Sequence, residues 1–238
     1  MPQHSDDLWL GSANGPQSSS WAGPGTVYAG VGPLGRVYIF DIVPSTLSAT
    51  AVCAAQAVAA AGNATINGST ASGGVATLDC ARAIQIVSSS TDTTQTVTLT
   101  GTDYWGQAQT QLLTLNGATA VVSTKTFKTI TKVAVSAALV GNLSVGTADV
   151  FGLPYRVTDA GYLLRTGWAG AVADNAGTFV AADTTSPATN ATGDVRGTFA
   201  PTGSASNGTR RLVIGIGLTA VAAGPNATQT GAIGVTPA

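Results

Sequence analysis

The chain has 238 residues, of which 44% are hydrophobic and only 9% are charged, and its formal net charge is −1. This length is enough for one large all-β domain or two small sandwiches, without a disulfide to stabilise them. The balanced charge argues against a nucleic-acid partner, because binding to phosphates requires a basic surface. The longest apolar runs are too short to span a membrane as a helix, and the N-terminus lacks the pattern of a Sec signal peptide.

The residue types that favour helices are scarce. All eleven acidic residues are Asp, and the chain has three lysines and one methionine. Thr, Val and Gly dominate instead, which favours strands and turns. A soluble monomer usually carries more charge, so the composition also favours a homo-oligomer or a subunit of a larger assembly.

Residues 1–44 are predicted to form an extended N-terminal arm followed by a first strand. The arm is rich in Gly, Pro and Ser, and its isolated aromatic residues Trp9, Trp21 and Tyr28 are expected to anchor it on its own core or on a neighbour. Val37–Val43 is a continuous run of β-formers ended by Pro44, which predicts a buried strand.

Residues 45–150 are predicted to form a β-sandwich module. The Ala-rich stretch 47–61 fits a strand and turn slightly better than a helix. Strands are expected at 83–87, 96–100, 108–115 and 125–135, separated by turns at 101–106 and 116–117. In the last of these strands Phe127 and Val133 fall on one face of the alternating pattern and Ile130 falls on the other, which indicates a β-bulge.

Residues 151–238 are predicted to form a second β region, which can pack with residues 36–44. Leu212, Ile214, Ile216 and Leu218 alternate with Gly215 and Gly217, and the two glycines indicate that a backbone or a ring lies close to that face. The spacing of short strands predicts an all-β protein built as a β-sandwich, Ig-like or jelly-roll. Whether it forms one sandwich or two stays open.

No pattern of catalytic residues emerges, so the sequence predicts a protein that is not an enzyme and binds no cofactor or metal. The single histidine, His4, lies in the arm, and no glycine-rich phosphate loop is present. Asp174, Asn175 and Asp183 could offer oxygens to Ca²⁺, but their spacing matches no known calcium loop. The basic residues Lys125, Lys128, Lys132, Arg210 and Arg211 are interpreted as a solvated or interfacial spot rather than a nucleic-acid site.

Four residues outside the arm are candidates for an interface. Tyr104 and Trp105 lie with Asp103 in a turn, either as a hairpin tip that packs on a neighbouring subunit or as a sugar-binding platform. Asp194 and Arg196 would share one face of a strand and pair there. Cys53 and Cys80 could face each other across a hairpin, but buried free thiols are the favoured interpretation.

Five stretches resemble a β-sandwich module that is common in virion proteins of tailed bacteriophages. They are AAAGNATING (59–68), SGGVATLDCAR (72–82), VTLTGTDYWGQAQTQLLTLNGAT (97–119), STKTFKTITKVAVS (123–136) and ADTTSPATNATGDVRGTFAP (182–201). They cover about half of the chain and leave residues 1–45 unmatched. The family pattern often has an acidic residue after the GTD turn, where this chain has the uncharged AQTQLL.

The resemblance implies a virion structural protein of the capsid decoration, or cement, type. Such a protein would sit on the capsid surface as a homotrimer, bridge neighbouring major capsid protein subunits and be assembled in the cytoplasm of the bacterial host. The alternatives are a tail, fibre or head–tail connector component and a carbohydrate-binding β-sandwich module.

Overall fold

The computed structural model describes residues 34–169 and 177–219. Within these ranges the chain forms strands and connecting loops, and a single 3₁₀ turn at Ala160–Tyr162 is the one helical element. The prediction of an all-β protein is therefore confirmed. No helix in the described part is long and apolar enough to cross a membrane.

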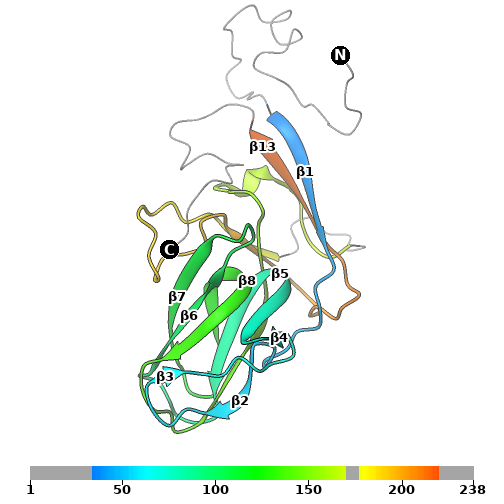
Figure 1. Ribbon diagram of the computed structural model, residues 1–238. Helices are drawn as coiled ribbons and strands as arrows, with labels where there is room; N and C mark the ends of the chain where they lie inside the picture. The colour runs from blue at the N-terminus through cyan, green and yellow to red at the C-terminus, as the bar shows by residue number, and fades with distance from the viewer. Residues whose placement is uncertain (1–33, 170–176, 220–238) are drawn as a thin grey trace, which may run out of the picture.

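A large antiparallel sheet forms the body of the molecule and curls into a half-barrel (Figure 1). Its strands follow the order β11-β12-β9-β5-β8-β6-β7, and the short strands β2, β3 and β4 pair with β9, β8 and β5. The bounds are β2 Cys53–Ala57, β3 Gly62–Asn63, β4 Ala71–Ser72, β5 Val75–Ser88, β6 Thr96–Thr102, β7 Ala108–Thr114, β8 Val121–Val135, β9 Asn142–Gly152, β11 Gly177–Val180 and β12 Thr198–Pro201.

The half-barrel encloses a core of alternating apolar residues. Ile84 and Ile86 of β5 and Val97 and Leu99 of β6 are fully buried, as the period-two pattern predicts. The Ala-rich stretch also forms the expected strand, β2. These side chains account for the burial that holds the curled sheet together.

The predicted bulge in β8 is confirmed. Thr100 pairs with Lys132 while the next residue, Gly101, pairs with Ile130, so one residue of β8 is left over at this point. The bulge places both Ile130 and Val133 in the core despite their opposite parity. A side chain at Gly101 would not fit, because its Cβ would lie 1.9 Å from the carbonyl oxygen of Thr129.

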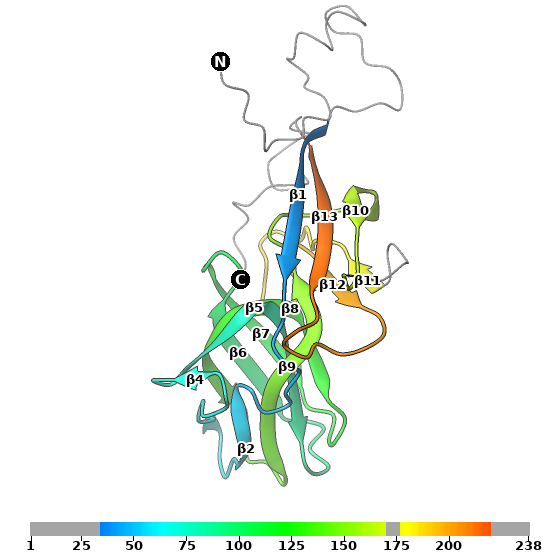
Figure 2. The same cartoon turned by 90° about the vertical axis from the view of Figure 1, so that its right-hand side faces the viewer.

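A second, three-stranded sheet stands above the half-barrel (Figure 2). It consists of β1 Leu34–Ile42, β13 Leu212–Thr219 and β10 Leu163–Arg165, with β13 in the centre. The strand predicted at Val37–Val43 forms as part of β1, but the prediction that it is buried is wrong. β1 lies at an edge, so Phe40 faces the core while Ile39 is 55% exposed and Val43 is 50% exposed. Because the run VYIFDIV is apolar at nearly every position, the sequence does not show which of its residues face the core.

The glycines of β13 lie under β10, at ordinary contact distance. A Cβ at Gly215 would come no closer than 3.4 Å to the nearest atom, the backbone nitrogen of Arg165, and one at Gly217 no closer than 3.7 Å to the carbonyl oxygen of Tyr162. The expected neighbouring backbone is present, but the approach is looser than two glycines on one face would suggest.

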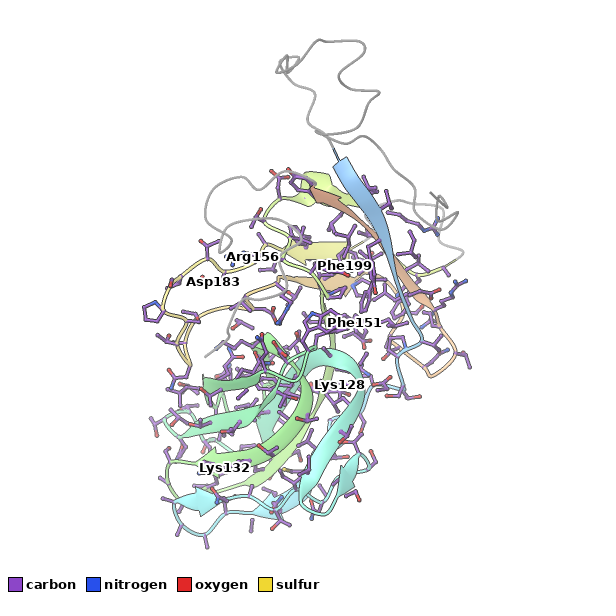
Figure 3. The ribbon with its side chains drawn as sticks, turned by 45° about the horizontal axis from the view of Figure 1, so that its top comes forward. Lys128, Lys132, Phe151, Arg156, Asp183 and Phe199 are labelled. Carbon is purple, nitrogen blue, oxygen red and sulfur yellow. The ribbon has the colours of Figure 1, made fainter. Side chains whose placement is uncertain are left out.

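A second core fills the space between the two sheets. Figure 3 shows Phe151 and Phe199 there, and both belong to a buried cluster with Phe40, Trp168 and Ile214. Segment 151–219 contributes to both sheets, because β12 pairs with β9 while β13 pairs with β1. Residues 36–42 thus pack with the second β region, as the sequence suggested.

Candidate functional site

A buried polar junction joins the half-barrel to segment 181–197, which connects β11 to β12. This segment covers the outer edge of β7, where the backbone nitrogen of Leu112 donates to the carbonyl oxygen of Asn190 at 2.9 Å. We call the polar side chains that hold this segment against the half-barrel, or that bridge β7 and β8 beside it, the polar junction. They are Asp103, Gln107, Gln109, Gln111, Lys125, Thr126, Arg156, Asp183, Asp194 and Arg196.

Asp194 is the central acceptor of the polar junction. One of its oxygens, Oδ2, accepts from the backbone nitrogen and the hydroxyl of Thr126 at 3.0 and 2.7 Å, and Oδ1 accepts from the backbone nitrogen of Arg196 at 2.9 Å. Burial raises the pKa of Asp194, and these hydrogen bonds oppose the rise. The carboxyl therefore fixes segment 181–197 to β8.

The expected pairing of the Asp194 and Arg196 side chains across one strand face is wrong. Residues 194–196 lie outside any strand, and the guanidinium of Arg196 forms its ion pair with Asp103, Nη1 to Oδ2 at 2.6 Å. Its Nη2 also donates to Gln107 at 2.8 Å. The sequence missed this pair because its members lie 93 positions apart. Asp194 and Arg196 are both buried inside the chain, so they offer little surface to another subunit.

Lys125 and Arg156 supply two more buried cations to the polar junction. The Lys125 ammonium donates to the carbonyl oxygens of Thr110 and Thr189, at 3.0 and 2.7 Å, which bridges β7 to segment 181–197. Burial lowers the pKa of Lys125, while Asp194 and Asp183 oppose that effect. Arg156 donates to the carbonyl oxygen of Asp183 at 3.4 Å, and Figure 3 shows these two residues beside each other.

Asp183 holds the turn within the segment itself. Its carboxylate accepts from the backbone nitrogens of Thr185 and Gly193 at 2.9 and 2.7 Å. These hydrogen bonds, that of Thr185 first, hold the pKa of Asp183 below its ordinary value. Asp174 and Asn175, the other residues considered for Ca²⁺, lie outside the described residues. In the described part, no three His, Cys, Asp or Glu side chains gather as a metal site would require.

Two glutamine side chains close the gap between β7 and β8, which are not paired through their backbones. Gln111 accepts from the backbone nitrogen of Lys125 at 2.9 Å and donates to the hydroxyl of Thr124. Gln109 donates to the carbonyl oxygen of Thr126 at 2.6 Å. Both amides are buried and replace the missing backbone hydrogen bonds. The uncharged sequence after the GTD turn therefore has a structural use here.

The turn that carries Tyr104 and Trp105 packs on its own chain. Asp103 accepts from the backbone nitrogens of Trp105 and Gln107, and the Trp105 indole donates to the carbonyl oxygen of Pro154 at 2.7 Å. The two aromatic rings meet at 71°, so they do not form a flat platform for a sugar. Trp105 is nevertheless 46% exposed, and its contact with a neighbouring subunit stays a prediction.

A further buried cation, Arg82 of β5, links the two sheets. Its Nη2 lies 2.6 Å from Oδ1 of Asp149 and donates to the Ser206 hydroxyl at 3.0 Å. Its Nη1 donates to the carbonyl oxygen of Ser45 at 3.1 Å, and the guanidinium lies 5.3 Å from the centre of the Phe151 ring. β5, β9 and the loops that lead to the upper sheet thus meet at one side chain.

The basic spot expected from three lysines and two arginines does not form. Lys125 points into the polar junction, and Lys128 donates to the carbonyl oxygen of Asp79. Arg210 lies over the Trp168 ring, and Arg211 forms an ion pair with Asp41 in the upper sheet. These cations serve separate parts of the fold.

Both cysteines are free and buried, as the favoured interpretation predicted. The alternative of a hairpin that places them face to face is wrong, because β2 pairs with β9 while β5, which carries Cys80, pairs with β8 and β9. Burial raises the pKa of each thiol to about 12.

Trp9, Trp21 and Tyr28 lie outside the described residues, as does His4, so the predicted role of the arm stays a prediction. A scan against models of protein families, a search of curated proteins and a search of solved structures each find no match for this chain.

Proposed function

We propose that this chain is a non-enzymatic structural protein of a tailed-phage particle, where it decorates the capsid and bridges neighbouring major capsid protein subunits. The observation that carries the proposal is the distribution of charge. At least four of the ten basic residues, Arg82, Lys125, Arg156 and Arg196, are buried inside the fold. Their contacts are made within the chain, so they add little charge to its surface.

The outer surface is correspondingly poor in charge and rich in large apolar side chains. Charged residues are 9% of the whole chain, whereas they make up about 25% of a typical soluble domain. Val140 is 79% exposed and Val180 is 57% exposed. Ile39 and Leu164 on the upper sheet and Val43, directly after β1, are exposed as well. Such a surface suits a protein whose faces are covered by neighbours.

A virion role is supported by the resemblance of the five stretches to modules of phage virion proteins. The stabilisation would follow mass action, since a protein that binds only the assembled shell shifts its stability by RT ln(1+[L]/Kd). Several engaged faces in a homotrimer would increase the effect through multivalency. The polar junction would keep segment 181–197 rigid, so that binding to the shell orders few additional residues.

The proposal is tested by adding the purified chain to shells that lack it and counting the copies bound. We expect saturable binding at symmetry-related positions and a higher temperature of shell disruption. Binding at one vertex or at the tail, in about a dozen copies or fewer, would instead indicate a connector or tail component. No binding to shells or tails would refute the virion role.

A further inference from the structure

Asparagine is followed by glycine at three places in the described part of the chain, at Asn67, Asn116 and Asn207. In such a pair the backbone nitrogen of the glycine can attack the side-chain carbonyl carbon of the asparagine, because glycine has no Cβ to obstruct the approach. Asparagine is a thermolabile residue. The fold surrounds the three pairs differently, so their reactivities should differ.

The side-chain oxygen of Asn207 accepts three hydrogen bonds. Asn207 lies in the loop that joins β12 to β13, which Figure 2 shows below the upper sheet. Its Oδ1 accepts from the backbone nitrogen and the hydroxyl of Thr209, each at 3.0 Å, and from the backbone nitrogen of Arg210 at 2.7 Å. Negative charge develops on this oxygen when the carbonyl carbon is attacked. Donors that are already aimed at such an oxygen lower the barrier, as in an oxyanion hole.

The surroundings of Gly208 leave room for the attack. A Cβ placed on Gly208 would meet no atom nearer than Oγ1 of Thr46, at 3.8 Å, and both Asn207 and Gly208 are exposed, so hydroxide can take the amide proton. The Gly208 N–H donates to the carbonyl oxygen of Pro44 at 3.0 Å. This hydrogen bond lies in the plane of the peptide group, whereas the nitrogen attacks through a face of that plane.

The glycines of the other two pairs are more confined. A Cβ on Gly68 would lie 2.2 Å from the carbonyl oxygen of Ala51, so backbone atoms crowd the nitrogen that would have to move. Gly117 is buried, and its N–H donates to the carbonyl oxygen of Asp92 at 2.7 Å. A Cβ on Gly117 would also lie 3.0 Å from the carbonyl oxygen of Ser90. Both nitrogens are therefore hindered in approaching the neighbouring side chain.

We propose that Asn207 is a site of spontaneous deamidation, at which the fold promotes attack by the Gly208 nitrogen. A bond forms between this nitrogen and Cγ of Asn207, and the bond from Cγ to Nδ2 breaks. Nδ2 leaves as ammonia and carries away the proton that the Gly208 nitrogen has lost. One water molecule then opens the cyclic imide at either carbonyl group, which gives aspartate or isoaspartate at position 207.

The modification changes the loop between β12 and β13. In the cyclic imide the Gly208 nitrogen carries no hydrogen, so the loop loses its hydrogen bond to the Pro44 carbonyl. Either product adds one negative charge to the chain, and isoaspartate also lengthens the backbone by one atom. The inference concerns the isolated protein and does not rest on the proposed virion role.

The test is peptide mapping by mass spectrometry of the purified full chain during incubation in mildly alkaline buffer, with and without denaturant. We expect Asn207 of the folded chain to deamidate at least about tenfold faster than Asn67 and Asn116, and the three rates to converge in denaturant. Equal rates in the folded chain would overturn the proposal. The same ranking in denaturant would also overturn it, because the difference would then come from the local sequence.

Two variants of the full chain test the role of the Thr209 hydroxyl. Thr209→Val removes this donor and should slow deamidation at Asn207 about fivefold, which is the rate equivalent of one ordinary hydrogen bond. Thr209→Ser keeps the hydroxyl and should keep the parent rate. Deamidation at Asn67 serves as the internal control and should be unchanged in both variants. A rate at Asn207 that is unchanged or faster in Thr209→Val would contradict the proposal.

Discussion

The Asp103–Arg196 ion pair should be among the strongest single contributions to the attachment of segment 181–197. Its side chains are 3% and 2% exposed, and its Nη1 and Oδ2 atoms lie 2.6 Å apart. Asp103→Asn keeps the size of the side chain but removes the charge. The amide has one oxygen, so it cannot both accept from the turn nitrogens and compensate the Arg196 guanidinium.

Removal of one partner of a buried ion pair destabilises proteins by about 3–5 kcal/mol, because the other charge stays buried without compensation. Gln107 still accepts from Arg196, so we expect about 3 kcal/mol for Asp103→Asn. Arg196→Met should lower the stability by a similar amount. The double variant should lose less than the sum of the two, with a coupling of about 2 kcal/mol.

The assay is urea unfolding of the three variants and the parent chain, followed by circular dichroism, with hydrogen exchange of segment 181–197 as a local readout. Asp41→Asn serves as the control, because Asp41 and Arg211 pair on the exposed surface, where an ion pair contributes little. Single variants that each change stability by less than about 1 kcal/mol, and add up in the double variant, would refute the reasoning.

Three further predictions follow from other parts of the fold. Burial raises the pKa of the Cys53 and Cys80 thiols to about 12. Both thiols should therefore resist an aromatic disulfide reagent at pH 8 in the folded chain and react fully in denaturant. Rapid reaction of the folded chain would contradict their burial. The folded-state pKa of Asp183 lies below its unfolded value of 3.8, so its contribution to stability is present above that pH and is lost on acidification through the folded pKa. Asp183→Asn should therefore reduce the slope of the unfolding free energy against pH in this range. An unchanged slope would contradict the prediction. Gly101→Ala should destabilise the chain by about 3 kcal/mol or more, because the added Cβ would meet the Thr129 carbonyl. Gly217→Ala should change the stability by less than about 0.5 kcal/mol. Similar unfolding midpoints for the two variants would be inconsistent with the bulge geometry.

The strands of the half-barrel could be predicted from the sequence because each has one buried face. The period-two pattern of Val97 and Leu99 and the phase slip at Ile130 are local signals, and the structure confirms both. β1 was misjudged for the opposite reason. Its run VYIFDIV is apolar at nearly every position, and such a run does not reveal whether a strand is central or at an edge.

The polar junction could not be predicted, because its contacts join residues that are distant in the chain. Arg196 reaches Asp103, Lys125 reaches Thr189, and Gln111 meets Lys125 only because the sheet curls. The one local signal was the closeness of Asp194 and Arg196, and it suggested the wrong partner. The uncharged polar residues after the GTD turn were a second signal. Their use in bridging β7 to β8 can be recognised only when the structure shows that the backbones of these strands are not paired.

The central claim, that this chain coats a phage capsid, is tested most directly by cryo-electron microscopy of an intact particle that carries it. We predict density for the two stacked sheets on the outer shell, in hundreds of copies, with the apolar surface around Ile39 and Val180 turned toward neighbouring chains. Density for the chain that is confined to the tail or to one vertex of the particle would contradict this claim.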